Sequence, residues 1–208
     1  MTTVSRVKRG RKFDQVLEGA RTVFLRDGFD GASVDDITRE AGVSKATLYS
    51  YFPDKRLLFL EVAKGECRRQ AETAVEFDDT DSAPESVLMI AGRRIAELAS
   101  SDFGRSVFRV CVAEAERFPE VGHEFYKSGP GLVRQRLIGY LEGAVARGQL
   151  AIDDIALAAA QFAELCKAEV QMRRLFHQDE AFPAKRRDCI VRGAVEMFMS
   201  RYGVGGRD

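Results

Sequence analysis

Apolar residues recur along almost the whole chain at the spacing of an amphipathic helix. The first such stretch repeats them three or four positions apart: Phe13, Val16, Leu17, Ala20, Val23 and Phe24. No segment shows the sustained alternation of apolar and polar residues that is typical of a half-buried strand. The pattern therefore predicts an all-α protein.

Glycine and serine residues mark the boundaries of the first two helices. We expect the first helix to end at Gly28, because glycine is favoured just past a helix C-terminus. Ser33 then begins a second helix, with an acid three residues later, which is close to a capping box. Ile37 and Ala41 form the inner side of this helix, and Gly42 ends it.

A third, short helix begins at Ser44 and must end near Phe52, because the following Pro53 disfavours helix at the residue before it. Asp54 then caps a long fourth helix. The apolar side of that helix carries Leu57, Leu58, Leu60, Val62 and Ala63.

An acidic connection over residues 76–86 follows the fourth helix. We place the main subdivision of the chain around that helix, with one domain over residues 1–55 and a second over residues 56–208. Further helices are expected at about 84–100, 103–118, 120–147, 153–177 and 183–202. The stretch "SGPG" at 128–131 interrupts the third of these, which is either kinked or two helices.

Composition places the chain among ordinary globular proteins. Of its 208 residues, 45% are hydrophobic and 31% are charged. No apolar run approaches the roughly 18 residues that a membrane span needs, and the basic N-terminus lacks the apolar stretch of a signal peptide. We therefore expect a cytoplasmic protein with no membrane partner.

The charge is unevenly distributed although the formal net charge is zero. The first twelve residues contain five cations and no acid: Arg6, Lys8, Arg9, Arg11 and Lys12. A basic end on a neutral chain favours contact with a polyanion, but charge alone fits a frayed, solvated terminus equally well.

The cysteines, by contrast, carry no spacing motif. Cys67, Cys111, Cys166 and Cys189 lie far apart and form no CxxC pair. We expect them to be free thiols that pack as small hydrophobic residues, with a redox role as the alternative.

Residues 34–42 and 44–52 have the pattern of a helix-turn-helix. In such a unit the second helix enters the major groove of DNA, so its outer side faces solvent when DNA is absent. Leu48 and Phe52, four positions apart, form the inward face. Five residues point outward or sideways: Lys45, Thr47, Tyr49, Ser50 and Tyr51.

The outward residues suit a groove because they are small, polar or amphipathic. A tyrosine ring can touch a thymine methyl group while its hydroxyl reaches a phosphate, and Lys55 adds a cation beside the groove. The alternative is a plain helical hairpin with surface tyrosines. The Gly42 turn, the helix length and the basic residues nearby favour DNA binding.

The stretch "FDGASVDDITREAGVSKATLYSYFPDKRLLFLEV" resembles the DNA-binding domain of TetR-family transcriptional regulators over about residues 12–62. The resemblance implies a three-helix DNA-binding domain with a basic arm over 1–55, and a ligand-binding and dimerisation domain over 56–208. It also implies a regulator, usually a repressor, whose partner is a double-stranded operator.

The family's DNA contacts carry over residue by residue. They lie at the cap of the second helix, on the third helix, which is the one that enters the groove in this family, and at the start of the fourth helix. The residues are Ser33, Lys45, Ala46, Thr47, Tyr49, Ser50, Tyr51 and Lys55. The arm from Lys8 to Lys12 would lie along the backbone or enter a minor groove. Two positions depart from the family pattern. Arg56 stands where an acid is frequent and could add a phosphate contact, and Thr38 stands where alanine is usual.

The C-terminal half resembles the regulatory domain of AefR- and AcrR-like members, on the stretch "FRVCVAEAERFPEVGHEFYKSGPG". The effectors of these members are unknown or hydrophobic, and no ligand contact carries over from the family. We expect a small hydrophobic effector in a pocket inside the helices between residues 84 and 170, with Glu114 or Arg93 as a polar anchor. Core packing remains the alternative for each candidate pocket residue. The candidates are Phe103, Phe108, Cys111, Val112, Phe125, Tyr126, Tyr140 and Phe162.

The same resemblance implies a homodimer. Residues 155–172 are rich in alanine, the last helix is apolar at helical spacing, and in the family two such helices pair with their mates as a four-helix bundle. A helix-turn-helix that reads a palindrome needs a two-fold partner. The alternative is a monomer in which both are core helices.

An enzyme is the rival class, and the sequence lacks its motifs. His123 and Glu124 begin like a zinc-protease motif, but Lys127 stands where the second histidine is required. There is no GxSxG, GxGxxG or P-loop. We therefore expect no catalytic residues, no cofactor and no metal. A DNA-binding protein without a small-molecule effector remains the second rival.

Overall fold

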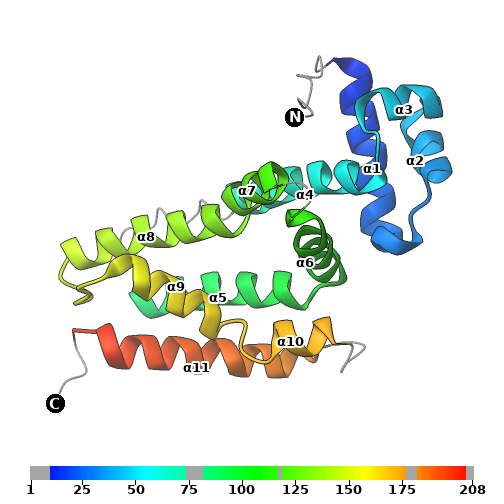
Figure 1. The fold of residues 1–208 in the computed structure, drawn as a ribbon. Coiled ribbons are helices and arrows are strands. Elements are labelled where there is room, and N and C mark those ends of the chain that lie inside the picture. The colour runs from blue at the N-terminus through cyan, green and yellow to red at the C-terminus, as the bar shows by residue number, and fades with distance from the viewer. Residues whose placement is uncertain (1–9, 74–81, 117–118, 177–181, 205–208) are drawn as a thin grey trace. The chain divides into compact units, whose positions relative to one another are not determined.

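The computed structural model describes residues 10–73, 82–116, 119–176 and 182–204. These residues form eleven helices and no strand (Figure 1), which confirms the all-α prediction. The helices are α1 (Arg11–Gly31), α2 (Val34–Ala41), α3 (Lys45–Tyr51), α4 (Lys55–Thr73), α5 (Pro84–Ser100), α6 (Asp102–Ala115), α7 (Pro119–Ser128), α8 (Pro130–Ala146), α9 (Ile155–Leu165), α10 (Val170–Leu175) and α11 (Ala184–Tyr202). Within the described residues, none of these helices is long and apolar enough to cross a membrane.

The described residues divide into two compact units. The first contains the chain up to Glu66 together with Ser106–Phe125, and the second contains Cys67–Arg105 and the chain from Tyr126 onward. Helices α4 and α6 each contribute residues to both units. The helix-turn-helix therefore shares its unit with most of α6, a helix that lies far along the sequence.

The helix ends follow from local backbone chemistry. Helix α1 is interrupted at Gly28, which has φ of +71°, so the regular first helix ends where the glycine predicts it, and another helical turn follows. The expected helix over 120–147 is two helices, α7 and α8, with Gly129 between them and Pro130 opening the second.

One predicted helix, 153–177, is wrong. Helix α9 ends at Leu165, and α10 begins at Val170. Between them Glu169 has φ of +65°, and the Val170 N–H donates to the Ala168 carbonyl oxygen at 2.8 Å. This is a classical γ-turn, which is rare and strained for a residue with a side chain. The sequence has no glycine or proline at the break, and the helical spacing of apolar residues continues across it, so the break was not predicted.

The first unit is built on contacts among aromatic and aliphatic side chains. Phe13 stacks on Phe52 with ring centroids 5.4 Å apart, and Phe24 meets Phe59 edge-on at 5.0 Å. Each such pair contributes about 0.5–1.5 kcal/mol beyond its buried area. These contacts join α1 to the end of α3 and to α4. The predicted inner face of α2, Ile37 and Ala41, is buried, as expected.

Helices α1 and α2 approach each other closely at Gly19. A Cβ atom at this position would lie 2.6–2.7 Å from the backbone nitrogen, Cα and Cβ of Ala41. Real Cβ atoms do not come that near to backbone atoms. The glycine is therefore required by the distance between the two helices, although its own backbone conformation is helical.

The second unit has a core formed by α5, α8, α9 and α11. Phe162 of α9 is fully buried and meets Phe198 of α11 edge-on at 5.4 Å. The core cluster consists of Leu88, Ala91, Ala96, Leu137, Leu141, Ala144, Leu150, Ile152, Ala158, Ala159, Phe162, Cys166, Val191, Ala194, Val195 and Phe198. Many small residues in this set let the helices lie close together.

The cysteines differ from one another in their surroundings. Cys166 is buried as expected, and its burial raises the pKa of the thiol to about 12. Cys111 is half-buried. Cys189 is exposed, so the expectation of buried packing is wrong for this residue. The side chain of Cys67 lies outside the described residues.

We expect Gly19→Ala to destabilise the protein by about 1–3 kcal/mol or more, because the new methyl group overlaps the backbone of Ala41. The matched control is Gly65→Ala in α4, where an added Cβ has nothing within 4 Å. That change should stabilise the protein by roughly 0.5–1 kcal/mol through the lower backbone entropy of alanine. Urea denaturation measures both, and equal shifts for the two variants would contradict the close approach.

Candidate DNA-binding surface

The turn between α2 and α3 depends on a glycine. Gly42 adopts the left-handed conformation, with φ of +63° and ψ of 35°. The Val43 N–H donates to the Thr38 carbonyl oxygen at 3.1 Å, which closes the end of α2. A residue with a side chain would be strained here, so the predicted Gly42 turn has a clear physical basis.

Two side chains seat α3 on the first unit. Leu48 is fully buried and Phe52 nearly so, which confirms the predicted inward face. At the start of the helix, Ser44 Oγ accepts a hydrogen bond from the Thr47 N–H at 3.1 Å. Helix α3 is thus capped at its N-terminus by Ser44, and the burial of Leu48 and Phe52 fixes its orientation on the first unit.

The opposite side of α3 faces solvent. Lys45, Ala46, Tyr49 and Ser50 are exposed, and Tyr49 has 48% of its surface accessible. A single exposed tyrosine is common on protein surfaces, so its exposure shows that the ring is accessible to a partner but does not require one. Tyrosine combines an apolar ring with a polar tip, which suits a surface that is alternately wet and covered.

Two predicted contacts lie at the sides of the helix. Thr47 is half-buried, and its hydroxyl lies 2.9 Å from Ser44 Oγ. Tyr51 is half-buried too, with its ring edge-on to Phe13 at 5.6 Å between centroids. Both remain partly accessible, as the prediction of sideways positions requires.

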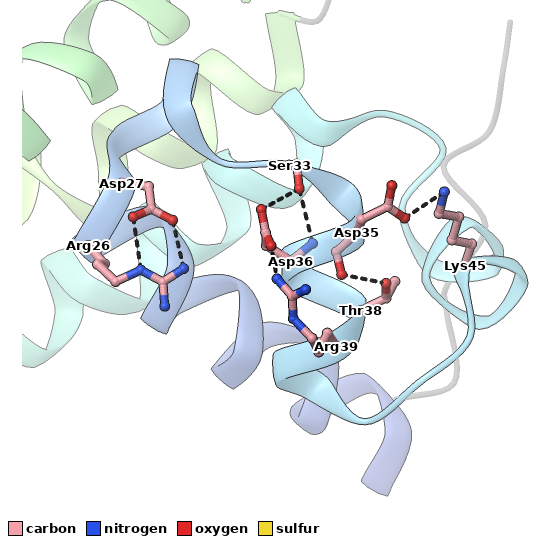
Figure 2. A network of polar contacts seen from close by, with 8 residues as sticks. All are labelled: Arg26, Asp27, Ser33, Asp35, Asp36, Thr38, Arg39 and Lys45. Carbon is pink, nitrogen blue, oxygen red and sulfur yellow. Dashed lines mark hydrogen bonds and ion pairs between the residues drawn. The ribbon is translucent and has the colours of Figure 1, made fainter.

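Polar contacts around α2 hold the surface in shape, as Figure 2 shows. Ser33 caps the helix: its Oγ accepts from the Asp36 N–H at 3.0 Å and donates to Asp36 Oδ2 at 2.5 Å. Asp36 also pairs with Arg39. Thr38, the departure from the family pattern, is buried and donates to the Asp35 carbonyl oxygen at 3.0 Å, so its hydroxyl is satisfied.

An ion pair links α3 to the first turn of α2. Lys45 Nζ lies 2.6 Å from Asp35 Oδ1, and both side chains are more than half exposed (Figure 2). Asp35 raises the pKa of Lys45, mainly through this hydrogen bond. The surface that would meet a phosphate therefore carries its own anion beside its cation.

Lys55 has intramolecular partners that the sequence did not indicate. Its Nζ donates to the carbonyl oxygens of Phe29 and Ala32, each at 2.9 Å, and lies 4.5 Å from the centroid of the Phe29 ring. The ammonium group thus holds the segment between α1 and α2 against the start of α4. A phosphate contact by Lys55 stays a prediction.

Arg56 is similarly engaged. Its guanidinium bonds Asp54 at 2.7 Å and Glu114 at 2.6 Å. These carboxylates, Asp54 first, raise the pKa of the arginine. Glu114 comes from α6, so this contact could not be read from the sequence around the helix-turn-helix.

The basic arm is described in part. Residues 6–9 lie outside the described residues, so their predicted DNA contact is not placed. Arg11 and Lys12 form the exposed start of α1.

The eight candidate pocket residues are divided between the two units. Phe162 is a core residue of the second unit, whereas Phe108, Val112 and Tyr126 are exposed. The others are half-buried: Phe103, Cys111, Phe125 and Tyr140. A cavity of about 270 Å³ in the first unit has a different lining, which includes Glu114, the predicted polar anchor.

A short helix with a polar and aromatic exposed side, preceded by a glycine turn, has the geometry of a helix-turn-helix. A model of the TetR family of bacterial regulatory proteins matches residues 16–62. A model of the C-terminal domain of AefR-like transcriptional repressors matches residues 86–204. The chain therefore belongs to the TetR family, a family of transcriptional regulators rather than enzymes, as the sequence predicts.

Relatives in sequence are repressors that match over a minor part of their length. The repressor AcnR of Corynebacterium diphtheriae is 34% identical over 76 residues, which is 36% of this chain and 40% of AcnR. IcaR, a negative regulator of the biofilm operon in Staphylococcus aureus, is 33% identical over 51 residues, which is 24% of this chain and 27% of IcaR. The chain thus spans less than half of these relatives.

Solved structures match over nearly the whole chain. A TetR-family regulator from Mesorhizobium loti superposes with a TM-score of 0.80 at 24% identity, over 93% of this chain and 98% of the other. The flavonoid-responsive regulator FrrA superposes with a TM-score of 0.66 at 28% identity, over 95% of this chain and 100% of the other. The likeness confirms the predicted fold class.

We expect Asp35→Asn to strengthen DNA binding several-fold. The change frees Lys45 and removes an anion from the binding surface, so the salt dependence should steepen by up to about one unit of slope. Stability should change by less than about 1 kcal/mol, since the pair is exposed. Anisotropy titrations at several salt concentrations measure both quantities. Asp153→Asn, an exposed acid in the second unit, is the matched control. Unchanged affinity and slope would show that Lys45 does not meet phosphate.

Proposed function

We propose that the protein is a cytoplasmic transcriptional repressor that binds a palindromic operator as a homodimer and is released by a small hydrophobic effector. The observation that carries the proposal is the one-sided burial of α3. Leu48 and Phe52 hold it in place, and the other side is polar, aromatic and accessible. A helix of this kind can enter a major groove without leaving apolar bulk in water.

The DNA contacts follow from that geometry and from the family resemblance. Tyr49, with its ring exposed, is placed to touch base edges, and Lys45 to meet a phosphate once it leaves Asp35. The proposed contact set is Ser33, Lys45, Ala46, Thr47, Tyr49, Ser50, Tyr51 and Lys55. We also propose the functional boundary at residues 55 and 56, so that α4 begins the regulatory domain.

A homodimer is supported by the exposed sides of α9 and α11. Many small and apolar residues of the two helices, such as Ala158 and Val191, are buried in the core of the protomer itself. The faces left for a partner carry other apolar side chains, Leu157 at 50% exposure and Met197 at 59%. Burial of these residues by a second copy would remove them from water.

The effector class is supported by the AefR-like domain and by FrrA, a structural neighbour that responds to flavonoids. Aromatic side chains are frequent among the eight candidate pocket residues. We propose that a small, mainly apolar molecule binds in the second half of the chain and favours a state with lower operator affinity.

Selection of bound DNA from a random pool tests the function directly. We expect the purified protein to return one palindromic sequence, bound by two chains per duplex. A pool that shows no enrichment would overturn the DNA-binding proposal, and a non-palindromic site bound by one chain would overturn the dimer.

Tyr49→Ala should then lower affinity for the selected site about tenfold, because a good contact with a base is worth on the order of 1 kcal/mol or more. Tyr126→Ala is the matched control, since Tyr126 is an exposed tyrosine outside the helix-turn-helix. Equal effects of the two changes, measured by anisotropy on the same duplex, would remove Tyr49 from the contact set.

A thermal-shift screen with flavonoids and other apolar metabolites tests the effector. A ligand that binds the folded state should raise the melting temperature and lower operator affinity in the same concentration range. Stabilising ligands that leave operator affinity unchanged would favour a DNA-binding protein without such a switch.

A further inference from the structure

Helix α6 is joined to α4 and α1, the helices on either side of the helix-turn-helix in the sequence, by two ion pairs of opposite polarity. Glu114 Oε1 of α6 lies 2.6 Å from Arg56 Nη1 at the start of α4. Five residues earlier, Arg109 of α6 lies 3.8 Å from Asp30, in the last turn of α1. All four residues belong to the first compact unit. Helix α6 thus offers an anion to α4 and a cation to the end of α1.

The pair with Arg56 is the stronger of the two. Glu114 is 5% exposed, and its second oxygen, Oε2, is shielded without a hydrogen-bond partner among the described residues. A buried carboxylate needs a compensating charge, and here Arg56 supplies it. Arg109 and Asp30 are at least half exposed and farther apart, so their attraction is largely screened.

Arg56 lies at the point where the helix-turn-helix meets α4. Asp54, in the short connection between α3 and α4, accepts hydrogen bonds from both the backbone N–H and the guanidinium of Arg56. The neighbouring Lys55 holds the carbonyl oxygens of Phe29 and Ala32, just ahead of α2. The first turn of α4 is therefore tied to the end of α1 and to α6, and residues 52–54 connect it to α3.

The cavity of about 270 Å³ is lined by these charged residues, and its lining does not suit an apolar effector. It is lined by Phe29, Asp30, Arg56, Ser106, Arg109, Val110, Ala113 and Glu114. Effector pockets for apolar molecules are mainly apolar, whereas half of this lining is charged and already paired within the protein. The charges serve the contact between α6 and the helix-turn-helix.

We propose that Arg56 and Glu114 are positioning residues for operator binding. Their ion pair seats α6 against the first turn of α4 and so holds α3 in the orientation that DNA requires, and Arg56 is not a phosphate contact. The inference rests on the proposed DNA-binding function. It concerns a position at which this chain departs from the usual family pattern.

A double-mutant cycle tests the proposal with full-length protein and the selected operator. Arg56→Gln and Glu114→Gln should each weaken binding on the order of tenfold, the usual size of coupling between linked sites. The double variant should be no weaker than the worse single one, because both changes remove the same contact. Independent roles would instead multiply to about a hundredfold.

The salt dependence separates positioning from direct contact. Arg56→Gln should leave the slope of log affinity against log salt unchanged, whereas loss of a phosphate contact reduces its magnitude by about 0.9. Arg56→Lys keeps a cation near Glu114 and should keep most of the affinity. Glu116→Gln, an exposed acid just past α6, is the charge control and should bind as the parent protein does.

Hydrogen exchange keeps the test decisive if a glutamine variant folds poorly or if no operator is found. Exchange in α6 and in the first turn of α4 should be faster in Arg56→Gln, which removes the ion pair, than in Arg56→Lys, which keeps a cation near Glu114, and Glu116→Gln should exchange as the parent protein does. If the parent protein selects DNA, two results would contradict the positioning role alone: multiplicative losses of affinity in the double-mutant cycle, or a reduced salt slope for Arg56→Gln. A parent protein that selects no DNA would overturn the proposed function, and the exchange result would then decide whether the contact exists.

Discussion

The burial of Leu48 under α3 is the contact on which the rest of the DNA-binding surface depends. Full burial of a leucine side chain contributes about 1.5–3 kcal/mol, and here it acts on a helix of seven residues that could not persist alone. Phe52 extends the same anchor by stacking on Phe13. Because these contacts lie on one side of α3, the residues on its other side are not needed for core packing and can contact a partner.

The charges around this helix are paired within the protein before any DNA arrives. Lys45 pairs with Asp35, Lys55 holds two carbonyl oxygens, and Arg56 is shared by Asp54 and Glu114. For Lys45 and Lys55, binding to a phosphate would then be an exchange of partners, with a smaller net gain than a count of cations suggests. The arrangement also joins the start of α4 to α6, a helix far along the sequence, through side chains rather than through the backbone alone.

Periodicity and end signals in the sequence predicted much of the fold. The Gly28 and Gly42 breaks, the Ser33 and Ser44 caps and the Leu48 anchor are local features, and local chemistry determines them. The break at Glu169 was missed because a γ-turn formed without glycine or proline leaves no compositional trace.

The candidate site was predicted only where its parts are close in sequence. Exposure of Tyr49 follows from its place opposite Leu48, whereas Lys55 bonds Ala32, 23 positions away, and Arg56 bonds Glu114, 58 positions away. Pairings at that distance depend on how the helices pack. The apolar pattern of α9 and α11 predicts a subunit interface, yet many of these residues pack in the core, and the pattern does not show which faces stay exposed.

Hydroxyl-radical footprinting of the protein tests the central claim most directly, because it reports the accessibility of individual tyrosines. Tyr49 and Tyr126 are both about half exposed, at 48% and 54%, and should be oxidised at comparable rates in the free protein. With saturating operator DNA, the account predicts strong protection of Tyr49 and no protection of Tyr126. Oxidation of Tyr49 that is unchanged by bound DNA would contradict the assignment of α3 as the helix that enters the groove.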